Sequence, residues 1–196
     1  MRPFLMIAAV ALSGCLQVPF RPSTPEPEPQ ALPLMGWDIQ PEGPEWTEAT
    51  LDAINAHGEV LLSLVPKDIY EWCPGYVEAD TEDRAAFWTG MFSVLAKHES
   101  TWNPRAAGGG GAWIGLVQID PRTAKGYGCN AQSAEELKDG AANLSCAVRI
   151  AAHTVPRDGY VGTGSEGLAA DWGPFHSERK RSDMVNWTRS QPYCAG

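Results

Sequence analysis

A stretch of apolar residues at helical spacing in the middle of the chain sets the strongest limit on its fold. Asp80 or Thr81 can cap a helix there. The apolar face that follows consists of Phe87, Trp88, Met91, Phe92 and Leu95. We therefore predict a helix that runs to about Glu99 and is buried at the centre of the domain.

Helical patterns continue on both sides of this segment, whereas alternating strand patterns are scarce. Further helices are expected at about Glu48 to Leu64, after the Asp120-Pro121 cap, after the Ser133/Glu136 capping box around Leu144 to Ala151, and near Gly167 to Ala170 and Glu178 to Thr188. With 43% hydrophobic residues in 196, the chain has enough apolar side chains for one core. The sequence predicts a mostly helical single domain with one irregular, glycine-rich segment.

Charge is distributed unevenly along the chain, whose formal net charge is -9. Residues 15–83 carry fourteen acids against two bases, whereas residues 84–196 carry twelve bases against ten acids. The longest basic run is Arg179-Lys180-Arg181, which is too short to form the basic stripe that phosphate binding requires. The composition therefore argues against nucleic acid as a partner.

Residues 1–14 have the features of a secretory leader. Arg2 precedes an apolar run from Phe4 to Leu12, which is too short to cross a bilayer as a helix. The run ends in Leu12-Ser13-Gly14-Cys15, which resembles the bacterial lipoprotein box and implies cleavage before Cys15 and acylation of its amino end. Leu16 after the cysteine resembles lipoproteins sent to the outer membrane of Gram-negative bacteria. We expect a periplasmic, lipid-anchored protein that is a monomer.

The segment from residue 15 to residue 44 follows the lipidation site and is rich in proline. Eight of the sixteen prolines lie between residues 16 and 44. Such a segment is a semi-rigid spacer that spans roughly 90 Å at about 3.1 Å per residue, or a solvated lead-in with no required reach. The expected organisation is a leader over 1–14, a tether over 15–44 and a domain over 45–196.

Four cysteines remain after Cys15, and three pairings are possible in an oxidising compartment. We favour Cys129 with Cys146, which closes a short loop, and Cys73 with Cys194, which ties the C-terminus to the front of the domain. A zinc site is the alternative, but the cysteines lack C-x-x-C spacing and no H-E-x-x-H motif is present. We expect no metal and no cofactor.

The irregular segment carries the motifs with chemical content. Glu99-Ser100 is followed by Trp102-Asn103-Pro104, by four glycines at 108–111, and by the ten residues Gly115 to Ala124, which read GLVQIDPRTA. This order and spacing resemble the lytic transglycosylases of the soluble, goose-lysozyme-like (SLT) class, whose second motif reads G-L-M-Q-I-x-P-x-T-A. The resemblance covers Phe87 to Pro174 and implies an α+β, lysozyme-like fold with a cleft along the glycine-rich segment.

In that class, one glutamic acid cleaves peptidoglycan, and Glu99 holds its position. The resemblance implies that Glu99 protonates the oxygen between N-acetylmuramic acid and N-acetylglucosamine and then takes a proton from the C6 hydroxyl, which closes a 1,6-anhydro ring. Such an acid must be protonated near neutral pH, which burial among apolar groups favours. The helix face and Trp102 are the expected apolar surroundings. The alternative is a solvated residue at a helix end.

Other residues of the motifs are expected to contact substrate. Gln118 matches the cleft glutamine of the class, or it satisfies loop backbone; Ser100 orients the acid or caps the loop. Trp113 is a candidate sugar platform. The substrate-binding set implied is Ser100, Gln118, Trp113, Gly115, Asp171 and Trp172.

The chain departs from the class pattern at four places. Gly108 stands where many relatives have serine, the loop before Gly115 is one residue longer, and Val117 replaces methionine. The third motif, usually A-Y-N-A-G-P, reads AADWGP at residues 169–174 and lacks the tyrosine that positions the acid. Asp171 is either a second carboxylate that supports hydrolysis or a turn cap. The missing hydroxyl has three candidate replacements: Tyr127, Tyr160 and Tyr193.

Three functions are compatible with these residues. The first is an envelope-anchored lytic transglycosylase acting on peptidoglycan glycan strands. The second is a muramidase that uses water. The third is an inactive lipoprotein that binds peptidoglycan and keeps the fold as a scaffold.

Overall fold

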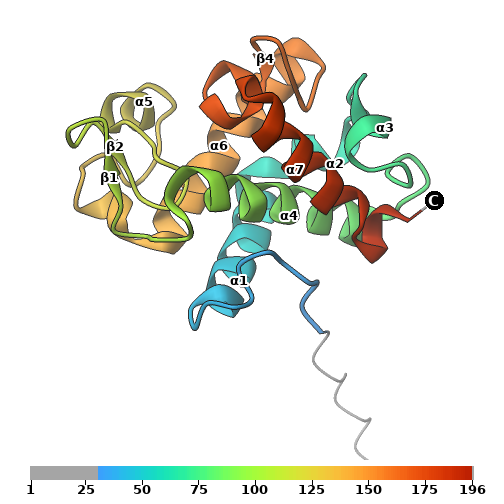
Figure 1. Cartoon of the computed structure of the whole chain (residues 1–196), viewed down its shortest axis with the longest axis horizontal. Coiled ribbons are helices and arrows are strands. Elements are labelled where there is room, and N and C mark those ends of the chain that lie inside the picture. The colour runs from blue at the N-terminus through green and yellow to red at the C-terminus, as the bar shows by residue number, and fades with distance from the viewer. Residues whose placement is uncertain (1–30, 196) are drawn as a thin grey trace, which may run out of the picture. The chain divides into compact units, whose positions relative to one another are not determined.

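Helix α4 (Thr81–Ser100) lies at the centre of the fold, as predicted. The computed structural model describes residues 31–195; the expected leader, Cys15 and most of the expected tether lie outside this range. The Asp80 carboxylate accepts a hydrogen bond from the Asp83 backbone N–H at 2.9 Å, which caps the helix. All residues from Ala85 to Ala96 are buried. Figure 1 shows α4 crossing the middle of the described chain, with α1 and α7 packed on it.

The first helical region starts earlier than predicted and is not a regular helix throughout. It consists of α1 (Gly43–Ala53), the π-helical turn η1 (Ile54–Gly58) and α2 (Glu59–Ser63), instead of one helix from Glu48 to Leu64. A Cβ at Gly58 would come within 2.6 Å of the Val148 side chain, and His57 Nε2 contacts the Ser145 carbonyl at 3.0 Å. The irregular turn therefore lies where this region packs closely on α6.

Of the caps of the next two helices, the sequence predicts Asp120 but not Asp139. Asp120 caps α5 (Pro121–Gly126), and Asp139 caps α6 (Gly140–Asp158). Ser133 and Glu136 form the capping box, since each accepts the backbone N–H of the other, but only the short 3-10 helix η2 (Glu136–Lys138) follows. Shorter elements complete the described chain: α3 (Ile69–Trp72), η3 (Leu168–Ala170), η4 (Gly173–His176), α7 (Glu178–Arg189) and η5 (Pro192–Cys194).

Two short antiparallel hairpins interrupt the helices. Strands β1 (Ala107–Gly108) and β2 (Trp113–Ile114) pair across a turn that contains the other three glycines of the run, and β3 (Gly162–Thr163) pairs with β4 (Glu166–Gly167). Gly109, Gly110 and Gly111 all have positive φ. The glycine-rich segment is thus a tight hairpin, more ordered than the irregular wall expected from sequence, because the turn uses backbone conformations that glycine adopts freely.

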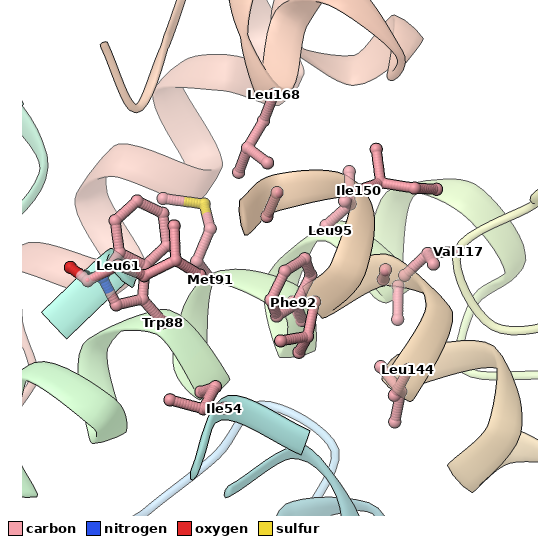
Figure 2. Close-up of a cluster of buried hydrophobic side chains, with 14 of the residues drawn as sticks. Ile54, Leu61, Trp88, Met91, Phe92, Leu95, Val117, Leu144, Ile150 and Leu168 are labelled. Carbon is pink, nitrogen blue, oxygen red and sulfur yellow. Dashed lines mark hydrogen bonds between the residues drawn. The ribbon is translucent and has the colours of Figure 1, made fainter. Parts of the chain in front are cut away.

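The core joins α4 to α6 and to the segment before α5. Figure 2 shows Trp88, Met91, Phe92 and Leu95 of α4 gathered with side chains of α6, of the first helical region and of the segment around Val117. The partners labelled there are Ile54, Leu61, Val117, Leu144, Ile150 and Leu168. Because Val117 belongs to this core, the segment between β2 and α5 is packed against the end of α4 that carries Glu99.

The compact unit extends upstream of the boundary expected at residue 45. It begins at Leu32, and Met35 and Trp37 are buried in its core. The Trp37 indole N–H donates to Thr47 Oγ1 at 2.8 Å, which fixes this lead-in on α1. Between residues 31 and 195, no helix combines the length and hydrophobicity that crossing a bilayer requires.

Both favoured disulfides are present. Cys73 pairs with Cys194 across 121 residues, and Cys129 pairs with Cys146 across 17. The first holds the C-terminal η5 next to α3, and the second joins the end of α5 to α6. Within the described range, no group of three or more His, Cys, Asp or Glu side chains is arranged to hold a metal ion.

Candidate functional site

Glu99 is the penultimate residue of α4, immediately before a sharp change in chain direction. Thr101 and Trp102 both have left-handed backbone conformations, with φ of 55° and 57°. Such conformations cost about 1 kcal/mol or more for residues other than glycine. Packing maintains them, since the Trp102 indole N–H donates to the Ser93 carbonyl at 2.9 Å. The turn ends the helix and leaves Glu99 at the wall of a cavity.

This cavity has a volume of about 320 Å³ and is open to solvent. It lies between the end of α4, the β2–α5 segment, α6 and the chain from Asp171 into α7. The lining residues are Glu99, Trp113, Gln118, Ile119, Asp120, Thr123, Ile150, Asp171, Trp172, Gly173, Pro174 and Lys180. An open cavity where polar and charged side chains converge beside apolar ones has the character of a site for a polar ligand.

Burial raises the pKa of the Glu99 carboxyl from its ordinary value of 4.5 to about 7. The charge of Lys180 acts in the opposite direction and lowers the pKa by a smaller amount. Desolvation has this effect because a carboxylate loses more by leaving water than the neutral acid does. Ile119, Ile150 and Trp172 are the large apolar side chains that line the same cavity together with Trp113. Glu99 is therefore partly protonated at neutral pH and can both donate and accept a proton there.

The source of this apolar environment differs from the one expected. Trp102 does not line the cavity; its ring packs against the core near Gly36, and its N–H is used by the Ser93 carbonyl. Trp172 lines the cavity instead, is 3% exposed and donates its indole N–H to the Val117 carbonyl at 2.8 Å. A tryptophan of the third motif therefore takes the place in the cavity lining that was expected of Trp102.

The segment from Gly115 to Gln118 is held in place by one buried side chain, Asn143 of α6. Its amide nitrogen donates to the carbonyls of Ile114 and Leu137, each at 3.0 Å, and its oxygen accepts the Val117 N–H at 3.0 Å. Gly115 has φ of 84°, and a Cβ there would collide with Leu137 and Asn143. Gly115 therefore shapes the segment, and the structure does not place it among the residues that line the cavity.

Gln118 lines the cavity and also satisfies loop backbone, so its place fits the cleft position and its hydrogen bonds confirm the loop role. Its side-chain nitrogen donates to the carbonyls of Gly115 at 2.9 Å and Ala106 at 3.3 Å. Its backbone is left-handed, with φ of 53°. Gly108 lies against the Gln118 amide oxygen, where a Cβ would collide with it. The glycine found in place of a serine thus leaves room for the Gln118 amide in its present position.

Trp113 lines the cavity with half of its surface exposed, at 51%. A Cβ at Gly109 would collide with its ring, so the glycine hairpin packs directly on the indole. An indole supported on one side and exposed to solvent is suited to stacking on a sugar face. The expected platform therefore has the right exposure and place.

Ser100 does not face the cavity. Its hydroxyl donates to the Leu116 carbonyl at 2.7 Å and contacts the Ala96 carbonyl at 3.3 Å. This residue therefore connects the end of α4 to the β2–α5 segment, which supports the loop-capping role over a direct contact with substrate. His98 also points away, since its Nε2 lies 2.8 Å from Asp183 Oδ2 of α7.

Asp171 lines the cavity and lies beside Tyr127 and Arg157. Partial desolvation raises the pKa of the Asp171 carboxyl, and the Arg157 charge and a hydrogen bond from Tyr127 lower it. Among the hydrogen bonds within residues 31–195, none runs from a backbone N–H to the Asp171 side chain, so this side chain does not cap a turn. The carboxylate is instead presented at the cavity wall, on the side formed by the third motif.

Of the three tyrosines that could replace the missing hydroxyl, the structure brings Tyr127 to the site, through Asp171. Tyr160 packs under the Lys67 ammonium at 4.6 Å from its ring centre. Tyr193 is buried, and its hydroxyl donates to the Leu34 carbonyl at 3.4 Å. Neither of the latter two residues lines the cavity.

Sequence reasoning missed Lys180, Thr123 and Pro174, which also line the cavity. Thr123 and Pro174 lie inside the motifs and could have been included. Lys180 gave no signal, because it belongs to a basic run of α7 that reaches the site only through tertiary packing.

The chain is similar to known proteins in part of its sequence and in its fold. The sequence profile of the transglycosylase SLT domain matches residues 77–159. No curated protein matches the chain significantly. Among solved structures, wild-type Bd0314 DslA (form 2) is similar with a TM-score of 0.77 and 24% identity, over 85% of this chain and 100% of that chain. A glutamate-to-glutamine mutant of DslA is similar with a TM-score of 0.76, 25% identity and the same coverage. The chain thus has the fold of DslA, and its residues 77–159, which include Glu99, are similar in sequence to the transglycosylase SLT domain.

Proposed function

We propose that this protein is a lytic transglycosylase that cleaves the bond between N-acetylmuramic acid and N-acetylglucosamine in peptidoglycan and leaves 1,6-anhydro ends. The observation that carries the proposal is the position of Glu99, a carboxyl with a pKa raised to about 7 in an open cavity of about 320 Å³. The similarity of residues 77–159 to the transglycosylase SLT domain supports the substrate class.

In the proposed reaction, Glu99 acts twice. The neutral carboxyl first gives its proton to the bridging oxygen, so the C1–O bond breaks and N-acetylglucosamine leaves with a free hydroxyl. The carbonyl oxygen of the 2-acetamido group stabilises the positive charge at C1. The Glu99 carboxylate then takes the C6 hydroxyl proton while O6 bonds to C1. No water is consumed, and Glu99 returns to its acid form.

The other lining residues are proposed to bind the glycan. Trp113 supports a sugar face from the β1–β2 side, and Gln118 presents a polar group next to it. Asp171 provides a hydrogen-bond acceptor for sugar hydroxyl or amide N–H groups on the opposite wall. Ser100 and Gly115 act indirectly, because they fix the chain segments that carry Glu99 and Gln118.

A hydrolytic muramidase is the second candidate, and Asp171 is the observation that favours it. A second carboxylate in the same cavity can activate a water molecule on the other side of the sugar ring, as in enzymes with two carboxylates. The products separate the two candidates, because anhydro-ended fragments are lighter than hydrolytic fragments by one water.

We also propose that the protein is anchored in the bacterial envelope through acylated Cys15 and is held at a distance by the proline-rich segment. This proposal rests on the sequence of residues 12–44. When cells that export the protein are grown with radiolabelled palmitate, the wild type should become labelled and Cys15→Ser should not. Equal labelling of both proteins would show that Cys15 is not the site of acylation.

The function is tested by digestion of purified sacculi with a soluble form that begins at Ala31. The wild type should release soluble fragments, and Glu99→Gln should lower the rate by about a hundredfold or more, because general acid catalysis is lost. Glu48→Gln, on the exposed face of α1, is the matched control. Glu99→Gln should still sediment with sacculi; if the wild type binds them but releases nothing, the protein is a scaffold and the proposal fails.

A further inference from the structure

Lys180 places a positive charge in the same cavity as Glu99. It is the third residue of α7 and lines the cavity. Its Nζ donates to the carbonyl oxygen of His98 at 3.0 Å. His98 directly precedes Glu99, so the ammonium group is attached to the last turn of the helix that carries the acid.

The three consecutive basic residues of α7, at positions 179–181, lie in three different environments. Arg179 is exposed, and Arg181 pairs with both carboxylate oxygens of Glu71. Lys180 is half-buried and forms none of the ion pairs found within residues 31–195. A cation in the first turn of a helix also faces the positive end of the helix dipole. Helix stability therefore does not account for its position.

We propose that Lys180 is a positioning residue that stabilises the carboxylate of Glu99 each time Glu99 gives up its proton. This inference rests on the proposed function, in which Glu99 changes from neutral acid to anion as the glycosidic bond breaks. A fixed ammonium group in a partly desolvated site stabilises that new charge without reorganisation. Desolvation alone would raise the pKa of Glu99 further and make it a weaker acid. The charge of Lys180 opposes this effect and so helps Glu99 to donate its proton.

Other charged groups near the cavity lie beside polar or charged partners of their own. Asp120, the cap of α5, is bonded to Arg122, and Asp171 lies by Tyr127 and Arg157. On the α4–α7 side, Asp183 accepts from both Lys97 and His98. Lys180 differs from these groups because its positive charge is matched by no carboxylate in the described ion pairs. The carboxylate form of Glu99 would supply the negative charge that Lys180 lacks.

The test compares Lys180→Gln with the wild type, with Lys180→Arg as the charge-restoring variant and Arg179→Met as the control on the same helix. Loss of the cation should raise the pKa of Glu99, so the fall of activity at alkaline pH should move upward by about one pH unit. The kcat on the acidic plateau should fall about three- to tenfold, because one pKa unit is a tenfold change in carboxylate stability. Lys180→Arg and Arg179→Met should resemble the wild type.

Two measurements keep the proposal testable independently of catalysis. Carbon-13 NMR titration of the carboxyl groups, with the Glu99 signal assigned from Glu99→Gln, should show the same upward pKa shift in Lys180→Gln. If the wild type proves inactive on sacculi while this shift is present, the function fails and the coupling stands. Lys180→Met gives the same comparison if the glutamine variant does not fold. An unchanged Glu99 titration, or a raised KM with an unmoved pH profile, would overturn the proposal.

Discussion

The side-chain oxygen of Asn143 accepts a hydrogen bond from the backbone N–H of Val117 at 3.0 Å, and through this contact α6 fixes the segment that carries Gln118. The Asn143 amide nitrogen also donates to two backbone carbonyls. Removal of the side chain leaves the buried Val117 N–H and Leu137 carbonyl without partners, whereas the Ile114 carbonyl still accepts the Ile119 N–H. This single residue therefore controls one wall of the cavity from the middle of a helix.

Asn143→Ala should lower the free energy of unfolding by about 3 kcal/mol, because buried polar groups without partners are costly. Urea denaturation measures the loss. Asn186→Ala, on the exposed side of α7, should change stability by less than about 0.5 kcal/mol. Activity of the folded Asn143 variant should also fall, since Gln118 loses its fixed position. A variant as stable and active as the wild type would show that the segment holds its conformation without Asn143.

The raised pKa of Glu99 makes stability depend on pH. Below about pH 4.5 the carboxyl is neutral in both the folded and unfolded states, so it adds no difference. Between about pH 4.5 and 7 the unfolded chain loses this proton while the folded protein keeps it, and stability falls as pH rises. The side chain in Glu99→Gln is neutral at every pH. The free energy of unfolding of this variant should therefore rise relative to that of the wild type across this interval.

The expected gain is about 2 kcal/mol above pH 7, after allowance for partial exposure of the carboxyl. Denaturation curves at pH 4.5, 6 and 8 measure it, with Glu48→Gln as the control for charge removal. The difference between Glu99→Gln and the wild type should be near zero at pH 4.5. A constant difference at all three pH values would indicate that the carboxyl is not desolvated in the folded protein.

Trp113 is expected to matter for substrate and little for the fold. Because half of the ring is exposed, Trp113→Ala should cost about 1 kcal/mol of stability or less. It should raise KM for glycan about tenfold, since an aromatic contact contributes about 1 kcal/mol or more. Kinetics with soluble glycan strands of defined length distinguish KM from kcat. Trp113→Phe should recover most of the binding; an unchanged KM in Trp113→Ala would remove the platform from the site.

The two disulfides should differ in their contributions to stability. In the chain-entropy treatment, the cross-link between Cys73 and Cys194 contributes about 5 kcal/mol and the one between Cys129 and Cys146 about 3 kcal/mol, because the first closes a longer loop. Paired serine substitutions tested by denaturation under oxidising conditions should reproduce this order. The reverse order would mean that residual structure in the unfolded chain, and not loop length, determines the effect.

Sequence predicts those parts of this protein that depend on local patterns. The limits of α4, the caps at Asp80 and Asp120 and the position of Glu99 at a helix end follow from residue spacing and side-chain chemistry. The π-helical turn at Ile54–Gly58 does not, since it depends on contact with α6. The same holds for Lys180 and for the meeting of Tyr127 with Asp171, because each joins residues from elements that only the folded chain brings together.

The central claim is that Glu99 transfers a proton to and from the glycan without the use of water. Its most direct test is mass spectrometry of fragments released from sacculi in water enriched in oxygen-18, with Glu99→Gln run in parallel. We expect fragments that end in 1,6-anhydro-N-acetylmuramic acid, carry no oxygen-18 and are absent from the Glu99→Gln digest. Fragments heavier by one labelled water, or equal release by both proteins, would contradict it.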